Sequence, residues 1–522
     1  KNGKLKTTQK NLHTLYFESL FSADNIAQNF PMKLNGQAEI FYRPKTEADK
    51  LGLKKDKSGK EVTNHKRYNE NKIFFHIPLT LNRTKPDPYR FNAQINDFLA
   101  QNSNINIIGV DRGEKHLAYY SIITQKGEIL ESGSLNTIKG GNGQEVNYAE
   151  KLEAKAKNRE QARKDWQAVE GIKDLKKGYI SQVVRKLADL AVKHNAIIVF
   201  EDLNMRFKQI RGGIEKSVYQ QLEKALIEKL NFLVNKGETD PKKAGHLLRA
   251  YQLTAPFETF KDMGKQTGII FYTQAAYTSR IDPITGWRPH LYLKYSSAEK
   301  AKTDLFKFTK IEFQNGRFEF TYDIKNFREQ KEWPKNTVWT VCSNVERFRW
   351  DKNLNQNNGG YTHYANLTDG KSIDKNPKST KPDNLKKLFE KYGIDIFKDI
   401  KAQIQSLEIK GNEKFFEHLI FFFNLICQIR NTQKEKDGDE NDFILSPVAP
   451  FFDSRKSGSF GKNLPKNGDD NGAYSIARKG IIILQKIKEF AKQNGNCEKM
   501  TWGDLHVSAI DWDDFTQNNQ AI

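Results

Sequence analysis

Two short apolar segments, each closing on acidic residues, constrain the fold of this chain more than any other feature. Residues 104–111 read Asn-Ile-Asn-Ile-Ile-Gly-Val-Asp and end at Asp111, and residues 196–203 read Ala-Ile-Ile-Val-Phe-Glu-Asp-Leu and carry Glu201. Short apolar runs of this kind, rich in β-branched residues, are typical of buried strands. The chain is therefore expected to contain an α/β core in which two strands end in a carboxylate.

The segments around these two strands indicate the order of the core. The sequence predicts two further strands and two helical stretches, at residues 117–123, 127–133, 148–194 and 218–234. Two or three antiparallel strands, the first bearing an Asp, are how an RNase H-like fold begins. The first and fourth strands of such a sheet lie side by side, so Asp111 and Glu201 are expected to meet.

A third acidic residue, Asp469, precedes a helix that is predicted to run to about residue 492, with Asp470 or Asn471 as its N-cap. Three carboxylates supply the hard oxygen ligands that Mg²⁺ prefers, and two divalent ions held in this way catalyse phosphodiester hydrolysis. An Asp just after a strand is also a common turn former or helix cap. The metal-site interpretation therefore depends on the joint placement of all three acids.

The charge of the chain favours a polyanionic partner. Lys plus Arg number 85 against 64 for Asp plus Glu, which gives a formal net charge of +21 over 522 residues. A chain of this length is expected to form about two to four domains. A balance this basic usually indicates nucleic-acid binding, and a generic basic surface is the alternative.

Cysteine usage and hydropathy bear on the compartment. Cys342, Cys427 and Cys497 are far apart and form no Cys-x-x-Cys pair, so neither a disulfide framework nor a cysteine-based zinc site is expected, and the cytoplasm is the expected location. The densest apolar stretch, residues 419–429, is too short and too broken to cross a membrane, and no secretory signal is present. Because the sequence opens on Lys1, we expect it to continue from a larger protein.

The regions outside the core have a different composition. Residues 37–43 and 72–79 are predicted strands, separated by a charged, loop-like stretch. Between about 274 and 468, Asn, Lys, Gly and aromatic residues increase while periodicity falls, which indicates an inserted domain. Within it, residues 351–383 are the most loop-like.

Three motifs resemble those of a known nuclease family. Ile-Gly-Val-Asp-Arg-Gly-Glu (108–114), Val-Phe-Glu-Asp-Leu-Asn (199–204) and Asp-Asn-Gly-Ala-Tyr (470–474) resemble the RuvC motifs of the type V-A CRISPR RNA-guided endonucleases, the Cas-twelve-a or Cpf-one family. Flanking stretches at 11–16, 33–39 and 251–257 are similar to that family as well. The resemblance covers nearly the whole chain and identifies it as the carboxy-terminal half of such an enzyme.

The resemblance implies a multidomain α/β architecture with an RNase H-like RuvC core, a mixed sheet flanked by helices. An inserted Nuc domain would split this core, and part of a β-rich wedge domain would precede it. The implied domains are the last wedge segment (1–87), RuvC part I (88–146), the bridge helix (147–165), RuvC part II (166–273), the Nuc domain (274–468) and RuvC part III (469–522).

The resemblance also implies roles for individual residues. Asp111, Glu201 and Asp469 would bind the metal, Mg²⁺ or Mn²⁺, as two ions. The family has Ala after the third acid where this chain has Asp470, and position favours Asp469 as the ligand. Arg430 and Asp442 of the insert would act near the cleaved bond, where Arg430 could clamp a phosphate. A structural ion pair is the alternative for Arg430.

Further implied residues bind RNA or another lobe. Trp166 would anchor the recognition lobe, unless it is an ordinary core tryptophan. The guide-RNA handle would be contacted by Asn11, His13, Arg43, Lys66, Arg67 and His76, each of which is alternatively a solvated side chain. The family also cuts its precursor RNA without metal through a His-Pro-Ala stretch that is not apparent here. His65 and Lys66 are stand-ins for it, and guide processing stays open.

The resemblance therefore implies a cytoplasmic, prokaryotic antiviral enzyme that cuts target and non-target DNA strands at one RuvC site after guide-RNA pairing. Its partners would be the guide RNA, the DNA and an amino-terminal half that carries the recognition lobe, with no membrane involved. A transposon-associated RNA-guided nuclease is an alternative, although those carry a Cys-rich zinc ribbon. A catalytically inactive guide-RNA and DNA scaffold is the other alternative.

Overall fold

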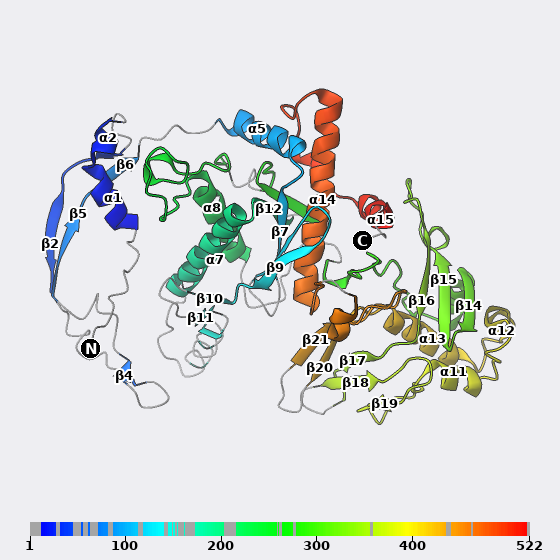
Figure 1. The fold of residues 1–522 in the computed structure, drawn as a ribbon. Helices are drawn as coiled ribbons and strands as arrows, with labels where there is room; N and C mark the ends of the chain where they lie inside the picture. The colour runs from blue at the N-terminus through cyan, green and yellow to red at the C-terminus, as the bar shows by residue number, and fades with distance from the viewer. Residues whose placement is uncertain are drawn as a thin grey trace. The chain divides into compact units, whose positions relative to one another are not determined.

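The computed structural model describes residues 12–27, 32–44, 54–55, 61–62, 71–81, 87–112, 118–139, 145–148, 150–151, 154, 161, 173–202, 216–257, 259, 264–274, 278–354, 359–434, 440–460 and 463–518 (Figure 1). The chain divides into two compact units. The first contains Lys1–Asp87 and Leu230–Ala255, and the second contains Pro88–Lys229 and Pro256–Ile522.

The described residues of the first unit form short helices and antiparallel strand pairs. Its elements are α1 (Leu12–Leu20), α2 (Ala23–Ala27), β1 (Met32–Leu34), β2 (Glu39–Arg43), β3 (Lys54–Lys55), β4 (Glu61–Val62), β5 (Lys72–His76) and β6 (Leu79–Leu81). The pairs β1–β6, β2–β5 and β3–β4 are antiparallel. Leu20, Met32 and Leu247 form a small core, so the segment 230–255 packs here, whereas the resemblance assigns it to RuvC part II.

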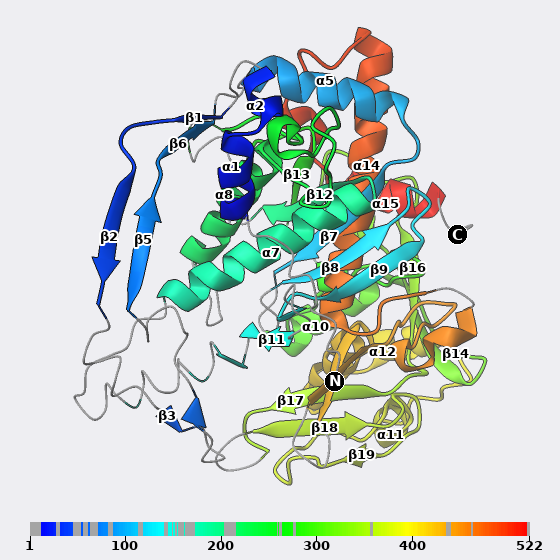
Figure 2. The ribbon, with the colours of Figure 1, turned by 60° about the vertical axis from the view of Figure 1, so that its left-hand side comes forward.

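A five-stranded mixed sheet is the centre of the second unit. Its order is β13-β12-β7-β8-β9, with β12 parallel to both β7 and β13 and the β7–β8–β9 pairs antiparallel. Figure 2 shows β7, β8 and β9 side by side. The strands are β7 (Asn106–Asp111), β8 (Tyr119–Ile123), β9 (Ile129–Ser134), β12 (Ala196–Asp202) and β13 (Ile270–Gln274), and β10 (Thr137–Lys139) pairs with β11 (Glu145–Asn147). The prediction that the first and fourth strands are neighbours is confirmed.

Helices cover both faces of this sheet, with α7 (Lys173–Lys193) and α8 (Lys216–Asn231) on one side and α14 (Gly468–Asn494) on the other (Figure 1). A further helix, α5 (Pro88–Gln101), packs against α14. Side chains alternate between the faces of a strand. Ile107, Val199 and Phe271 therefore join the core of α14, which also takes in Ile476 and Ile483.

Hydrogen bonds at Glu131 fasten β9 to β8 and to the end of α7. The Glu131 carboxylate accepts hydrogen bonds from Tyr120 Oη at 2.9 Å, Lys193 Nζ at 3.0 Å and His194 Nε2 at 3.1 Å. Burial raises the pKa of Glu131, but these three donors outweigh it and lower the pKa to about 2.

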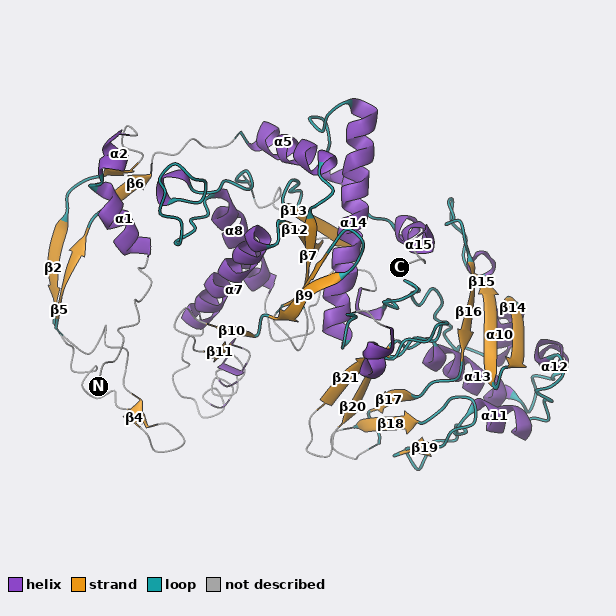
Figure 3. Ribbon diagram, viewed as in Figure 1, coloured by secondary structure: helices purple, strands orange, loops and turns teal. Residues whose placement is uncertain are grey.

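The insert is built of regular helices and strands (Figure 3). Its buried side chains form a core of their own. It contains two three-stranded sheets, β14 (Phe308–Gln314) with β15 (Arg317–Asp323) and β16 (Val338–Cys342), and β17 (Arg347–Asp351) with β18 (Gly360–Tyr364) and β19 (Ser372–Ile373). It also contains the hairpin of β20 (Arg430–Lys434) and β21 (Glu440–Ile444) and the helices α10 (Ala298–Phe306), α11 (Leu385–Lys391), α12 (Ile400–Ser406) and α13 (Glu413–Ile426).

The interpretation of residues 351–383 as loop was therefore wrong in part, because β18 and β19 lie there. Strands of two to seven residues give little periodicity to read. The helix α13 carries the densest apolar stretch of the chain, and most of its side chains are buried. Within the described ranges, no helix has the length and apolar character needed to cross a lipid bilayer.

The helix α15 (Ala509–Asn518) ties the insert to α14. Trp512 Nε1 donates to the Gly286 carbonyl at 3.0 Å, and the Arg288 guanidinium donates two hydrogen bonds, of 3.1 and 2.9 Å, to Asp513. Arg478 of α14 lies over the Trp512 ring at 5.0 Å. The helix α15 therefore contacts both the insert and α14, the helix that covers the sheet.

Candidate active site

Asp111 and Glu201 lie at the same end of neighbouring strands. In the parallel pairing of β7 with β12, Val110 is opposite Phe200, so each acid follows a paired residue. Asp111 and Glu201 are each 7% exposed. Both belong to the set of alternate side chains that faces α14. The adjacency of the first and fourth strands thus brings these two predicted residues together.

The third acid comes from the first turn of α14, because this helix lies unusually close to β7. A Cβ on Gly109 would lie 2.1 Å from the Ala473 carbonyl oxygen, and a Cβ on Gly472 would lie 2.1 Å from Asp111 Oδ2. A side chain on Gly109 would collide with main-chain atoms of α14, and one on Gly472 would displace the Asp111 carboxylate. The two glycines therefore let α14 bring Asp469, which is 5% exposed, to the carboxylate edge of the sheet.

The N-cap of α14 is Asn467, whose side chain accepts from the Asp470 N–H at 2.9 Å. The prediction of Asp470 or Asn471 as the cap was wrong, because the helix begins earlier and includes both. Asp470 instead accepts the Lys466 N–H at 3.0 Å and interacts with Ser132 of β9. It is thus Asp469 that interacts with Asp111.

The electrostatics of Asp111 reflect three carboxylates held together. Burial, and then the negative charges of Glu201 and Asp469, raise the pKa of Asp111 well above its usual value. The backbone N–H of Arg112 and the guanidinium of Arg430 act in the opposite direction. This cluster carries an excess of negative charge that a cation would relieve.

The insert contributes Arg430 and Asp442 from the paired strands β20 and β21. Arg430 Nε lies 2.9 Å from Asp442 Oδ2, and Arg430 Nη2 lies 3.5 Å from Asp469 Oδ1. Asp442 also accepts the Gly468 N–H at 3.1 Å. Burial lowers the pKa of Arg430, but Asp442 and Asp469 outweigh this and raise it above its usual value. The structure therefore brings both predicted insert residues to the start of α14.

Several residues that support this site were not predicted from the sequence. Thr278, in the short helix η2 (Thr278–Arg280), donates a 2.6 Å hydrogen bond to Glu201 Oε1. Arg112 pairs with Glu223 of α8 and donates to the main-chain oxygen of Glu201, so it links the ends of β7 and β12. The position of Arg112 directly after Asp111 is the sequence feature from which its contacts could have been predicted. No feature of the sequence predicts that Thr278 contacts Glu201.

The donors of this site suit a hard divalent cation in chemistry and in charge, since all three are carboxylates. No group of three His, Cys, Asp or Glu side chains in the described part of the chain is arranged as a ready-made metal site. Hydrogen-bonding or ion-pair partners engage Glu201 and Asp469, namely Thr278 and Arg430. The three carboxylates would therefore turn toward a common point to hold an ion.

The sequence profile of the RuvC nuclease domain matches residues 87–521. The chain belongs to this family. The RuvC match includes β7, β12 and α14, which carry the three acids, and it also spans the insert that carries Arg430. The nuclease assignment thus agrees with the fold class predicted from the sequence, an RNase H-like mixed sheet flanked by helices.

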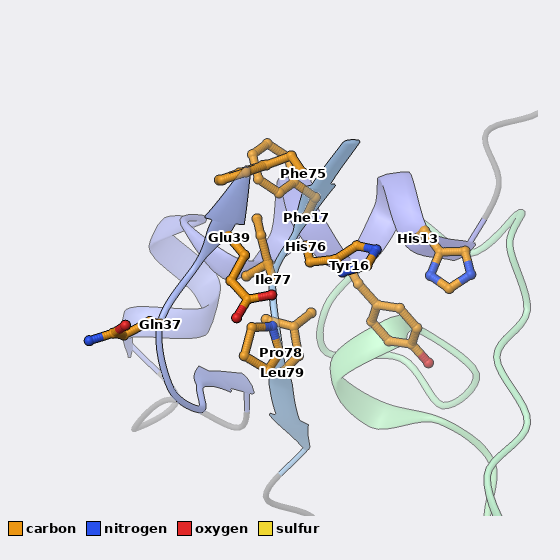
Figure 4. A pocket seen from close by; sticks show the side chains of 10 residues that line it. All are labelled: His13, Tyr16, Phe17, Gln37, Glu39, Phe75, His76, Ile77, Pro78 and Leu79. Carbon is orange, nitrogen blue, oxygen red and sulfur yellow. The ribbon is translucent and has the colours of Figure 1, made fainter. Parts of the chain in front are cut away.

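Residues 1–86 lie outside the RuvC match and contain a cavity of about 720 Å³ (Figure 4). His13 and His76, two of the predicted RNA contacts, line it together with Tyr16, Phe17 and Phe75. Arg43, the last residue of β2, is half-buried. The other predicted contacts and the lobe anchor, Asn11, Lys66, Arg67 and Trp166, lie outside the described residues, as does most of the stretch predicted as the bridge helix.

Proposed function

We propose that this chain is the nuclease-bearing part of an RNA-guided DNA endonuclease of the type V-A CRISPR kind. One observation carries the proposal: Asp111, Glu201 and Asp469 converge from two strands and a helix, and Arg430 of the insert closes on Asp469. A carboxylate cluster next to a guanidinium is what phosphodiester hydrolysis needs, because the scissile phosphate is an anion.

The three carboxylates would hold two divalent cations, Mg²⁺ or Mn²⁺, which when bound supply Lewis-acid catalysis of phosphodiester cleavage. Asp111 and Glu201 are fixed by the sheet, while Asp469 is fixed by the first turn of α14. Arg430 donates Nε to Asp442, which orients the plane of its guanidinium. Its remaining N–H groups would bind the scissile phosphate and stabilise charge as it develops.

The remaining parts of the proposal concern nucleic acid and partners. The net charge of +21 suits a backbone of phosphates. The cavity of the first unit offers aromatic rings and two histidines, groups on which RNA bases stack. In this proposal the first unit is a wedge domain that binds the guide-RNA handle, and the insert is a Nuc domain. An amino-terminal recognition half would select the target through the guide.

The test is guide-programmed cleavage of a labelled DNA duplex in Mg²⁺ by the complete protein, compared with Glu201→Gln, Asp469→Asn and Asp470→Asn. We expect the first two variants to bind the target but to cut at least about 100-fold more slowly, a typical cost of losing one charge-stabilising group. Asp470→Asn is the matched control, because an amide oxygen can still accept the Lys466 N–H.

Two results would contradict the proposal. Cutting by Glu201→Gln at the parental rate would show that the carboxylate cluster is structural. Target binding by the parent without any cutting would favour the inactive guide-RNA and DNA scaffold instead. Loss of cutting in Asp470→Asn with retention in Asp469→Asn would reassign the third acid and leave the nuclease proposal standing.

A further inference from the structure

A buried lysine, Lys479, lies beside the carboxylate cluster and takes no part in the chemistry described so far. It is 5% exposed and follows Asp469 by ten residues on α14. Its Nζ donates a 2.8 Å hydrogen bond to the main-chain oxygen of Gln274, the last residue of β13. Burying an ammonium group is costly unless negative charge compensates it, so its neighbours indicate its role.

Lys479 lies on α14, the helix that covers one face of the sheet, and the Glu201 side chain is on that same face. Gly480, the next residue of α14, packs on Val199, since a Cβ there would lie 2.9 Å from Val199 Cγ2. Side chains two residues apart on a strand share a face, so Glu201 points to the α14 side as Val199 does. Gln274 pairs in register with the residue after Glu201, so the carbonyl that holds the ammonium lies at the level of this acid.

The charges that act on Lys479 include two acids of the cluster. Burial lowers the pKa of the Lys479 ammonium to about 8, while Glu201 and Asp111 act to raise it and Arg288 acts to lower it. The group is therefore mostly charged at neutral pH. Arg430, another cation near the three acids, is already shared with the carboxylate of β21.

We propose that Lys479 is the resident counter-charge of this cluster and limits the affinity of the three carboxylates for divalent cations. The inference rests on the proposed function, because it concerns the cations that this site would hold. Without a divalent cation, the ammonium offsets part of the repulsion among the acids. A divalent cation is repelled by the same ammonium, so removal of the lysine charge strengthens cation binding.

Three variants of the full chain separate charge from hydrogen bonding. Lys479→Gln removes the charge but keeps an N–H donor for Gln274, whereas Lys479→Arg keeps the charge. Lys486→Gln is the matched control, because Lys486 lies on the same helix and forms a 3.0 Å ion pair with Asp511. Mg²⁺ binding is measured by titration calorimetry without nucleic acid, and thermal melting is recorded with and without Mg²⁺.

We expect Lys479→Gln to bind Mg²⁺ on the order of tenfold more tightly than the parent, because it lacks the ammonium that repels the dication. Addition of Mg²⁺ raises its melting temperature by more than it raises that of the parent, because a ligand stabilises the folded state more when it binds more tightly. Lys479→Arg and Lys486→Gln bind Mg²⁺ as the parent does. Equal or weaker binding by Lys479→Gln would overturn the inference and leave the lysine as a hydrogen-bond donor alone.

Two further results keep the inference distinct from the proposed function. If Lys479→Gln does not fold without Mg²⁺, saturating Mg²⁺ should restore folding, and its failure to do so would also overturn the inference. Asp111→Asn is titrated in parallel. Unchanged Mg²⁺ binding by Asp111→Asn would mean that the carboxylates are not the metal site, which refutes the proposed function whatever Lys479 does.

Discussion

We expect alanine in place of Gly472 to inactivate the site while it leaves the fold intact. The added Cβ would lie 2.1 Å from Asp111 Oδ2 and 2.7 Å from Asp111 Cγ. Ordinary contact begins near 3.4 Å, so the carboxylate oxygen would have to retreat by about 1.3 Å, the difference between these distances. Because the obstructed group is the end of a side chain, Asp111 can rotate away and the helix need not move.

The two consequences of this substitution have different magnitudes. An off-rotamer Asp costs about 1 kcal/mol, and an alanine in a helix is favoured over glycine by about as much, so the stability changes nearly cancel. A misplacement of about 1 Å in a catalytic constellation, however, costs on the order of 100-fold in rate. The expected result is therefore a slow enzyme with a melting temperature close to that of the parent.

The assay is the initial rate of DNA cleavage in Mg²⁺ together with thermal melting. The matched control is Gly178→Ala, at a glycine inside α7 whose added Cβ would meet nothing within 4 Å. This control should gain about 1 kcal/mol of stability and cut at the parental rate. Parental cleavage by Gly472→Ala would refute the reasoning, because it would mean that the position of Asp111 does not matter for the chemistry.

Three further predictions follow from other contacts. Gly109→Ala would place a Cβ 2.1 Å from the Ala473 carbonyl and 2.4 Å from the Ala477 nitrogen, which are backbone atoms and cannot rotate away, so chemical denaturation should show a loss of about 3 kcal/mol or more. A parental midpoint would contradict this. Glu131→Gln should be less stable than the parent above about pH 4.5, and the difference should vanish as the pH falls toward 2, because the folded pKa of about 2 lies below the ordinary 4.5. A pH-independent difference in melting temperature would point to packing instead. Arg430→Ala should cut about 100-fold or more slowly with unchanged affinity for DNA in binding titrations, and weaker binding at an unchanged maximal rate would assign the guanidinium to substrate capture.

The core of the site could be predicted because it depends on buried strands. A segment such as 104–111 can be recognised as a strand from its apolar, β-branched composition alone. The strand order of an RNase H-like sheet then predicts which strands are neighbours. This was enough to bring Asp111 next to Glu201. The third acid was placed by its position ahead of a long amphipathic helix, and the structure puts Asp469 in the first turn of that helix.

Other parts of the site depend on contacts between residues far apart in the sequence. The ion pair of Arg430 with Asp469 and the hydrogen bond of Thr278 to Glu201 join segments with no local pattern in common. The burial of Lys479 was equally hidden, because a lysine on a helix usually reaches solvent. The cap of α14 was misplaced because Asp470 and Asn471 are as suitable for capping as Asn467, and only the surrounding fold selects one.

The position of α14 after the insert in the element order has a consequence for biosynthesis. The apolar face of the sheet is covered by residues of α14 such as Ile476 and Ile483, which the ribosome adds long after β7 and β12. The insert has its own core and can fold first, whereas one apolar face of the sheet stays uncovered until α14 has been synthesised. We therefore expect the nascent chain to have no assembled carboxylate cluster, and no nuclease activity, until α14 has been synthesised.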